Sequence, residues 1–315
     1  MADNETRLVH QALLYKTEQE FVDAVVPFLR EGIANGERVI AVTTPPHKLA
    51  LIEEALDQDA SFVESLGIAE FSDTPARRLA GFHAHIQGTR RLRAVGELPW
   101  SGSGREREEW ARYESIVNVA LASGDADLLC LYDAGNLEAA VLDIAMRTHP
   151  LLLHGPHRQP SHGYVDPGEF TRAYDAAPLL EPEGPTETLE FRSEPDLRAI
   201  RRLLRGHAAR SGLIPGQIES LLVAASEVAT NVLRHGGGCG IVRCWVEPDR
   251  FTCEIADPWG RITDPFAGFV PPAPDQTGGR GLWLVRQLCD AVEIPSRDIG
   301  TVVRLHVRRG RDRTV

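Results

Sequence analysis

A stretch rich in proline and glycine, residues 155–185, interrupts an otherwise regular pattern of apolar and polar residues. Proline ends helices and central strands, and glycine favours turns, so this stretch predicts a connection between two separately folded parts. A chain of 315 residues is long enough for two domains that each bury a core. We therefore expect domains at residues 8–154 and 186–309, joined by 155–185, with one helical turn near Glu169–Tyr174.

Before this connection, short apolar runs alternate with stretches of helical period. Strands interleaved with helices indicate an α/β domain with a mainly parallel sheet and right-handed crossovers. The expected strands are His10–Tyr15, Arg38–Thr43, Ile68–Phe71, Arg91–Val95, Leu128–Tyr132 and Leu151–His154. The expected helices are Glu18–Ala34, His47–Leu56, Ala76–Gln87, Arg105–Ala122 and Leu137–Arg147.

After the connection, the pattern predicts helices grouped beside a mainly antiparallel sheet, which is a two-layer α/β sandwich. The expected strands are Thr186–Phe191, Gly240–Val246, Phe251–Ala256, Ala291–Ser296 and Gly300–Val307, and the expected helices are Glu194–Ser211, Gly216–His235 and Gly281–Cys289.

The composition excludes several classes of function. A net charge of −11 argues against sequence-independent nucleic-acid binding. Neither lysine, Lys16 or Lys48, follows a glycine-rich turn, so a Walker-A nucleotide site is excluded. No stretch has the apolar length of a membrane span, and the first residues lack a signal-peptide pattern, so we expect a cytoplasmic protein with no membrane partner. The five cysteines form no C-x-x-C pair and are expected to be reduced thiols.

The predicted helix that ends at His235 carries a polar pair. Glu227 and Asn231 project about 40° apart, one turn from each other, while apolar residues fill the opposite arc. A carboxylate and a carboxamide at the edge of a packed face suit a cation and a polyphosphate. Two more motifs follow in order, Asp257-Pro-Trp-Gly260 and Gly278-Gly-Arg-Gly281-Leu282. Each motif alone is a common turn or solvated face, but the ordered triple favours a nucleotide site.

This ordered triple resembles the GHKL (Bergerat) ATPase domain and, within it, the anti-sigma-factor serine kinases of the RsbW type. The resemblance covers residues 186–309. It implies that Asn231 coordinates Mg²⁺ on the ATP phosphates and that Glu227 is the general base for an attacking serine hydroxyl. Arg234 or His235 would reach the phosphates, and the residues leave that choice open.

The same resemblance assigns the adenine side and a lid. Asp257 would accept the exocyclic amine of adenine, Gly260 would let the backbone turn beneath the base, and Thr301 would complete the pocket. The family often has D-x-G-x-G where this chain has Pro258 and Trp259, which stiffen and enlarge the turn. The glycines would form a lid that ends at a helix N-terminus suited to an anion. The residues of this lid motif are Gly278, Gly279, Arg280, Gly281 and Leu282.

Scattered residues of the first part carry a second resemblance. They are His10-Gln-Ala-Leu-Leu-Tyr15, Tyr113-Glu114 with Asn118, Cys130-Leu-Tyr132-Asp133 and Thr148-His149-Pro150. On these, residues 8–153 resemble the MEDS sensory domain, a RecA/KaiC-like module of methanogen and methylotroph regulators. The stretch after the first strand, Tyr15-Lys-Thr-Glu-Gln, has no glycine to cradle a triphosphate, so we expect no ATP hydrolysis there.

Two ligand sites are conceivable in this part. The carboxyl end of the strand Leu128–Tyr132 would place Cys130, Tyr132 and Asp133 near Glu114 and Asn118 as a small-ligand pocket. A packed strand end with a capping Asp133 is the equal alternative. Four histidines could hold a metal, but in a proline-rich stretch we expect them to be solvated; they are His149, His154, His157 and His162.

The resemblances together predict a partner-switching regulator of transcription, typical of stress responses. Its sensory domain would bias a kinase domain that uses ATP and Mg²⁺ to phosphorylate a serine of an anti-anti-sigma (STAS) protein and that sequesters a sigma factor. A homodimer is also compatible with these resemblances. The alternatives are a non-catalytic ATP-binding anti-sigma or scaffold protein and a metabolite-responsive regulator. A histidine kinase is disfavoured, because no histidine is followed by an acidic residue.

Overall fold

The computed structural model describes residues 8–42, 45–67, 74–88, 90–100, 104–155, 157–272, 279–295 and 299–310. The chain divides into two compact units, Met1–Phe170 and Thr171–Val315. The division falls inside the proline- and glycine-rich stretch. Among the described residues, no helix combines the length and the apolar character that crossing a bilayer requires.

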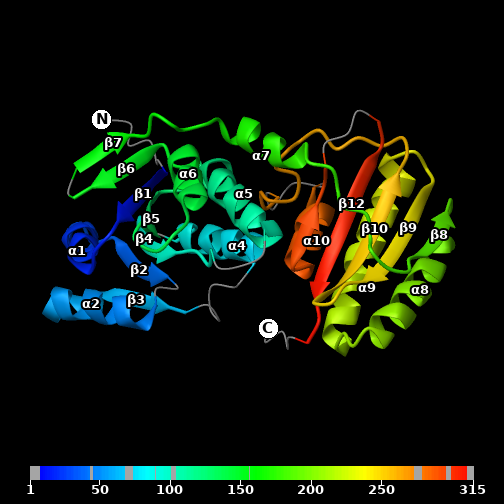
Figure 1. The fold of residues 1–315 in the computed structure, drawn as a ribbon, viewed down its shortest axis with the longest axis horizontal. Helices are drawn as coiled ribbons and strands as arrows, with labels where there is room; N and C mark the ends of the chain where they lie inside the picture. Colours follow the sequence, from blue (N-terminus) through cyan, green and yellow to red (C-terminus); the bar gives the residue numbers. More distant parts are fainter. Residues whose placement is uncertain are drawn as a thin grey trace. The chain divides into compact units, whose positions relative to one another are not determined.

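The N-terminal unit is built on a seven-stranded sheet with the order β3-β2-β4-β5-β1-β6-β7 (Figure 1). Neighbouring strands are parallel except β6 and β7, which pair antiparallel. This confirms the expected mainly parallel sheet. The strands are β1 Val9–Tyr15, β2 Arg38–Val42, β3 Val63–Leu66, β4 Leu92–Glu97, β5 Ala126–Asp133, β6 Leu151–His154 and β7 His157–Pro160.

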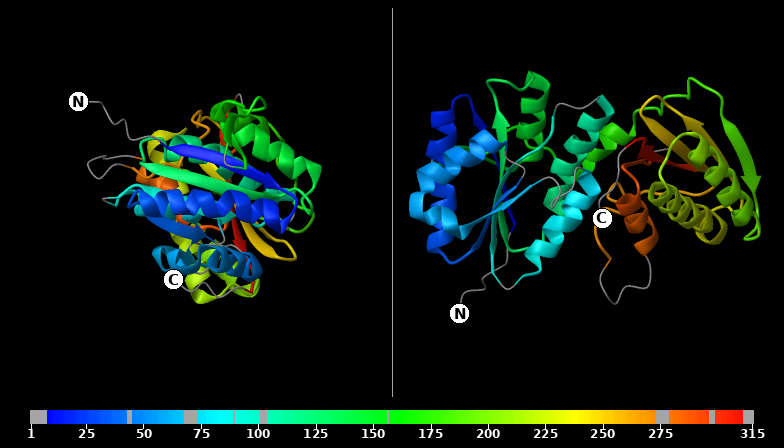
Figure 2. Two further views of the ribbon diagram at one scale, coloured as in Figure 1. Left: turned by 90° about the vertical axis from the view of Figure 1, so that its left-hand side faces the viewer. Right: turned by 90° about the horizontal axis from the view of Figure 1, so that it is seen from below.

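Helices cover both faces of this sheet (Figure 2, right). Leu13 and Tyr15 of β1 pack with buried residues of the first two helices, α1 and α2. Because side chains alternate along a strand, His10 and Ala12 point to the opposite face. The helices are α1 Glu18–Ala34, α2 Pro46–Leu56, the 3₁₀ helix η1 Asp57–Phe62, α4 Pro75–Ile86, α5 Gly104–Ala120 and α6 Ala139–Thr148; α7 Pro167–Asp175 contains the boundary between the two units.

Two strands of this unit differ from the sequence prediction. The expected strand Ile68–Phe71 lies outside the described residues, and the structure has β3 at Val63–Leu66. The strand β7 was not expected, because its residues are all exposed and show no apolar alternation. The single turn expected near Glu169–Tyr174 is a longer helix, α7.

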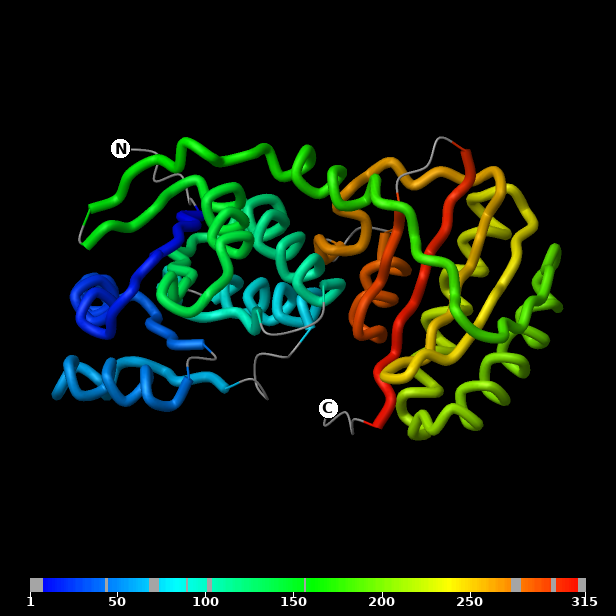
Figure 3. The backbone as a smooth tube through the Cα atoms, viewed as in Figure 1, coloured from blue at the N-terminus to red at the C-terminus, as the bar shows by residue number. Residues whose placement is uncertain are grey.

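The C-terminal unit has a five-stranded antiparallel sheet with the order β11-β12-β10-β9-β8. Three helices pack with this sheet, and their course can be followed in Figure 3. Leu221 and Val228 of the longest helix, α9, are buried in one cluster with Ile255 of β10 and Val303 of β12. The elements are β8 Glu187–Phe191, α8 Asp196–Arg210, α9 Pro215–His235, β9 Gly240–Val246, β10 Arg250–Asp257, α10 Arg280–Leu288, β11 Ala291–Glu293 and β12 Thr301–Arg308.

Candidate nucleotide site

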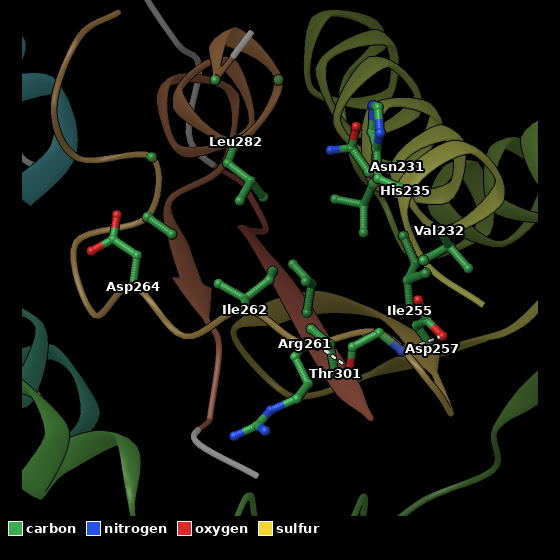
Figure 4. A pocket seen from close by; sticks show the side chains of 18 residues that line it. Asn231, Val232, His235, Ile255, Asp257, Arg261, Ile262, Asp264, Leu282 and Thr301 are labelled. Carbon is green, nitrogen blue, oxygen red and sulfur yellow. Dashed lines mark hydrogen bonds between the residues drawn. The ribbon is translucent and has the colours of Figure 1, made fainter. Parts of the chain in front are cut away.

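A pocket of about 400 Å³ opens between α9, α10 and the ends of β10 and β12 (Figure 4). This volume lies within the range of small-molecule sites. Residues of all three sequence motifs line it, although the motifs lie far apart in the chain. The predicted residues that line the pocket are Asn231, His235, Asp257, Gly260, Gly279, Gly281, Leu282 and Thr301.

Asp257 ends β10 with a buried carboxylate that backbone groups hold in place. Its Oδ1 accepts hydrogen bonds from the N–H groups of Trp259 and Gly260, both at 2.9 Å. Its Oδ2 accepts the N–H of Gly237 at 3.1 Å. A carboxylate offers about four lone-pair positions, so Oδ2 retains acceptor capacity for a donor in the pocket.

Glycines surround this carboxylate. A Cβ on Gly236 or on Gly260 would overlap the Asp257 side chain, and one on Gly237 would come within 3.0 Å of Asp257 Oδ1. The run of glycines after α9 therefore serves a close approach of the backbone to Asp257. From sequence, Gly260 was expected to let the backbone turn beneath the base, and the run Gly236–Gly238 was given no role, although three consecutive glycines are a visible signal.

Thr301 begins β12 directly opposite Asp257, since the two residues are register partners in the antiparallel pair. Its hydroxyl donates a hydrogen bond to the carbonyl oxygen of Gly260 at 3.0 Å. Gly300 precedes it with a φ of +77°, a conformation that favours glycine. The sheet register therefore brings two distant motif residues to one edge of the pocket.

The helix α9 supplies the polar pair. Figure 4 shows Asn231 and His235 on the side of α9 that faces the pocket, across from Leu282 of α10. A Cβ on Gly281 would lie 3.2 Å from Glu227 Oε2 and 3.3 Å from Asn231 Nδ2. Glu227 and Asn231 thus both face the first turn of α10, with Glu227 just outside the pocket lining.

The expected lid motif leads into α10. Gly279 is the N-cap residue with a φ of +84°, and the helix begins at Arg280, which is exposed. Gly279 and Gly281 line the pocket, so the start of this helix faces it. Gly278 lies outside the described residues.

Arg234 and His235 differ in position. His235 lines the pocket, whereas Arg234 does not. The guanidinium of Arg234 instead donates to Glu194 Oε1 at 3.0 Å, and both side chains are exposed. Of the two residues left open by the sequence, the geometry favours His235 for contact with a ligand.

Several lining residues were not predicted as site residues. An apolar part comes from α9 and the sheet, where the helical period already placed Val228 and Val232 on the buried face. The loop after β10 gives no pattern that would have revealed its contribution. The lining residues missed are Val228, Val232, Gly236, Ile255, Arg261, Ile262, Asp264, Ala267, Gly268 and Val303.

The expected N-terminal ligand residues separate into two groups. Tyr132 donates to Glu114 Oε1 at 2.7 Å, and Cys130 Sγ lies 3.6 Å from Glu114 Oε2. Asn118 on the same helix hydrogen-bonds His10. Asp133 points away from them and caps the following turn, accepting the N–H of Gly135 at 3.1 Å. The capping alternative therefore holds for Asp133.

The cavity beside these residues is small. It has a volume of about 30 Å³, which is room for a water molecule, and its lining includes His10, Cys130 and Tyr113. Tyr132, Asp133 and Asn118 do not line it. The expected pocket for a small organic ligand is thus not formed by these side chains.

His149 differs from its neighbours in sequence. It is buried, whereas His154, His157 and His162 are exposed. Its Nε2 lies 3.4 Å from Glu114 Oε2. The expectation of four solvated histidines is therefore wrong for His149, because helix α6 ends beside α5 and carries that ring into the core.

Burial and charge shift the pKa values in this cluster. Burial alone would raise the pKa of Glu114, but the neighbouring His149 and His10 outweigh it and lower that pKa. Burial raises the pKa of the Cys130 thiol well above its usual range, and the Glu114 carboxylate adds to that effect. Burial and His149 lower the pKa of His10, against the opposing effect of Glu114.

Comparison with family models matches both units. Residues 9–150 match the MEDS family, the methanogen/methylotroph, DcmR sensory domain. Residues 190–307 match the histidine kinase-like ATPase domain. The chain therefore combines a MEDS domain with a histidine kinase-like ATPase domain of the GHKL type.

Two relatives assign the histidine kinase-like ATPase domain to a family. The serine-protein kinase RsbW of Bacillus licheniformis is 33% identical over 127 residues, which cover 36% of this chain and 79% of the relative. This chain belongs to the RsbW family of serine-protein kinases. The RsbW protein of Bacillus pumilus is 31% identical over 118 residues, covering 33% of this chain and 73% of the relative.

A solved structure is also similar, that of the RsbU and RsbW domains of a Mycobacterium tuberculosis protein. It is 18% identical, with a TM-score of 0.31, and the match covers 40% of this chain. The match spans about a third (32%) of that protein's chain.

Proposed function

We propose that this RsbW-family chain binds Mg-ATP in the pocket between α9 and α10 and phosphorylates a serine of an anti-anti-sigma (STAS) protein, with sequestration of a sigma factor as its output. One observation carries the proposal. A single pocket gathers Asn231, Asp257, Gly281 and Thr301 from separate stretches of the chain, which supports the roles that the family resemblance implies for them.

The adenine side would lie at the sheet edge. The Asp257 carboxylate, held by three backbone N–H groups, has acceptor capacity for the exocyclic amine of adenine. A guanine presents a carbonyl at the corresponding position and would meet the carboxylate as a second acceptor. This arrangement supports selectivity for ATP over GTP.

The phosphate side would lie between the two helices. The amide oxygen of Asn231 is the hard ligand that Mg²⁺ prefers, and this cation usually takes only one or two protein ligands. The N–H groups at the start of α10, around Gly279 and Gly281, suit a phosphate. His235 at the pocket wall would add a donor to the phosphates.

Glu227 would then act as the general base. Its carboxylate faces the same turn of α10 as Asn231 and lies beside the pocket. The serine oxygen would form a bond to the γ-phosphorus while the bond to the ADP oxygen breaks, and the hydroxyl proton would pass to Glu227.

The N-terminal part would supply the regulation. We propose that residues 8–154 form a sensory domain of the RecA/KaiC-like type, joined by 155–185 to a kinase domain of residues 186–309. The mainly parallel sheet of the first unit supports this proposal.

Nucleotide binding is tested first, by thermal shift of the full chain with Mg-ATP and with Mg-GTP. Wild type should be stabilised by Mg-ATP, and Asn231→Ala and Asp257→Asn should lose that stabilisation. Glu219→Gln is the matched control, because Glu219 lies on the same helix but pairs with Arg205 at 2.9 Å on the exposed side. Equal stabilisation of all variants would contradict the assigned site.

Phosphoryl transfer is tested next, with [γ-³²P]ATP and the STAS protein recovered by co-purification from the native host. Label should reach a serine of the STAS protein, and Glu227→Gln should bind Mg-ATP normally yet transfer no label. ATP binding without transfer by wild type would instead favour the non-catalytic anti-sigma or scaffold function. Absence of ATP binding would favour a metabolite-responsive regulator.

A further inference from the structure

Four side chains with metal-binding atoms meet inside the N-terminal unit. They come from four places in the chain: His10 on β1, Glu114 on α5, Cys130 on β5 and His149 at the end of α6. One ligand atom from each lies within 4.8 Å of all the others. The side chains of His10, Glu114 and His149 are at most 1% exposed.

Four of the six distances between these atoms match a tetrahedral site, and the other two are at most 4.8 Å. Glu114 Oε2 lies 3.3 Å from His10 Nε2 and 3.4 Å from His149 Nε2. Cys130 Sγ lies 3.4 Å from His10 Nε2 and 3.6 Å from Glu114 Oε2. Tetrahedral bonds of about 2.0–2.3 Å to zinc place neighbouring ligand atoms roughly 3.3–3.7 Å apart. Charge-assisted N–H···O hydrogen bonds are shorter, about 2.7–2.9 Å, so the two histidine–carboxylate distances are long for such bonds, while the two sulfur distances also suit S–H hydrogen bonds.

Hydrogen bonds on the outer side orient both imidazoles. His10 Nδ1 lies 3.1 Å from the amide oxygen of Asn118, and His149 Nδ1 lies 2.9 Å from the carbonyl oxygen of Ala145. Each Nδ1 therefore donates outward, and each Nε2 presents a lone pair to the centre. Asn118 is itself fixed by donating to the carbonyl oxygen of Thr148 at 2.8 Å. Metal-binding histidines are oriented by such outer partners.

With both imidazoles neutral, hydrogen bonds alone leave His149 Nε2 unsatisfied, because the one proton of the Cys130 thiol can go only to His10 Nε2 or to Glu114 Oε2. With both Nδ1 atoms donating outward, two neutral imidazoles turn acceptor atoms toward the Glu114 carboxylate, which is also an acceptor. His149 Nε2 is a buried atom without a hydrogen-bond partner. Protonation of one ring would pair it with Glu114, and protonation of both rings would place two cations with ring centroids 4.1 Å apart. One divalent cation satisfies all four inward atoms.

We propose that His10, Glu114, Cys130 and His149 bind one divalent transition-metal ion, with Zn²⁺ the best match. Two imidazoles, a thiolate and a carboxylate are ligand types of zinc sites, and the softness of the thiolate disfavours Mg²⁺ and Ca²⁺. A divalent ion with one carboxylate and one thiolate gives a site with no net charge, which suits a buried position.

Binding changes the protonation of the site. The thiol of Cys130 loses its proton to solvent as the sulfur–metal bond forms, so one proton is released for each ion bound. The four ligands join β1, β5, α5 and the end of α6, so the ion ties together elements distant in sequence. This assignment departs from the expectation that the cysteines are all plain thiols, and it concerns Cys130 alone.

The test uses the full chain with any affinity tag removed, purified without added metal. Elemental analysis of wild type should find about one transition-metal ion per chain. After chelation, addition of Co²⁺ should produce the visible d–d bands of a tetrahedral ion and a near-ultraviolet thiolate charge-transfer band. His149→Ala should abolish the d–d bands, and Cys130→Ser, a small change expected to leave the fold intact, should abolish the thiolate band.

Two variants serve as matched controls. His154→Ala removes an exposed histidine near His149 in sequence, and Cys239→Ser removes a free cysteine of the other unit. Both should keep the full Co²⁺ spectrum and the metal content. The proposal fails if wild type contains no metal and its apo form gives no tetrahedral Co²⁺ spectrum. It fails equally if Cys130→Ser retains the thiolate band.

Discussion

Asp257 and Gly260 are joined by a hydrogen bond of 2.9 Å from the Gly260 N–H to the Asp257 carboxylate, in a turn that leaves no space for a side chain at position 260. Gly260→Ala should therefore displace the carboxylate from the pocket. We expect the affinity for Mg-ATP to fall about tenfold or more, equivalent to about 1.4 kcal/mol of binding free energy. Isothermal titration calorimetry measures this directly.

The control for that substitution is Gly184→Ala, because a Cβ at position 184 would meet no neighbouring atom. Its affinity for Mg-ATP should equal that of wild type. Unchanged affinity in Gly260→Ala would show that the position of the Asp257 carboxylate does not govern binding.

Arg234 and His235 should respond differently to substitution. Arg234 pairs with Glu194 in solvent and does not line the pocket, so Arg234→Ala, a surface substitution, should change Mg-ATP affinity by less than about twofold. His235 lines the pocket, and His235→Ala should weaken binding about five- to tenfold, the loss of roughly one hydrogen bond. A larger effect for Arg234→Ala, measured by the same titration, would reverse the assignment.

Which residues gather in the candidate nucleotide site could be predicted in part from sequence. Helical period placed Glu227 and Asn231 on one side of α9, and the order of the motifs placed Asp257 and Gly281 near them. The glycine run Gly236–Gly238 is visible in the sequence, but its partner is not, because the bond from the Gly237 N–H to Asp257 joins residues 20 positions apart. Supporting contacts of this kind depend on the tertiary fold.

The residues around Glu114 in the N-terminal unit illustrate the same limit of prediction from sequence. Strand alternation alone would have separated Asp133 from Cys130 and Tyr132, because side chains at odd and even positions point to opposite faces. The place of His149 could not be predicted in this way. Its proline-rich surroundings indicated a solvated residue, whereas the packing of α5 and α6 buries it against Glu114.

The pair Glu37–Arg93 should make stability depend on pH. Burial alone would raise the pKa of Glu37, but hydrogen bonds from Arg93 and its charge outweigh that effect and lower the pKa. A lowered pKa in the folded state means that the ionised carboxylate stabilises the fold above the unfolded pKa of about 4.3. That contribution is lost as the pH falls through the folded pKa.

Glu37→Gln should therefore lower the thermal midpoint at pH 7, and the gap to wild type should narrow progressively below pH ~4. Scanning calorimetry across this pH range measures the gap. Glu183→Gln, which removes an equal charge from an exposed position outside the helices and strands, should show no such dependence. A gap that stays constant between neutral and acidic pH would mean that the charge of Glu37 is not what stabilises the fold.

Arg304 and Glu254 form a buried ion pair on neighbouring strands. They are register partners on β12 and β10, with Arg304 Nη2 2.6 Å from Glu254 Oε2, and their side chains are 2% and 7% exposed. Removing one member leaves a buried charge without its main partner. Arg304→Met should therefore lower the free energy of unfolding by about 3–5 kcal/mol.

Removing both charges should cost less than removing one. In Arg304→Met/Glu254→Leu the uncompensated carboxylate is gone, so the double variant should recover much of the stability lost by Arg304→Met. Urea unfolding of wild type, Arg304→Met, Glu254→Leu and the double variant gives the four free energies of a double-mutant cycle. If the unfolding free energies lost in the two single variants add up to the loss in the double variant, the ion pair contributes nothing beyond the packing of its side chains. The stability of this part of the sheet would then come from the cation–π contact of Arg304 with Trp245 and from its hydrogen bond to the carbonyl oxygen of Leu180.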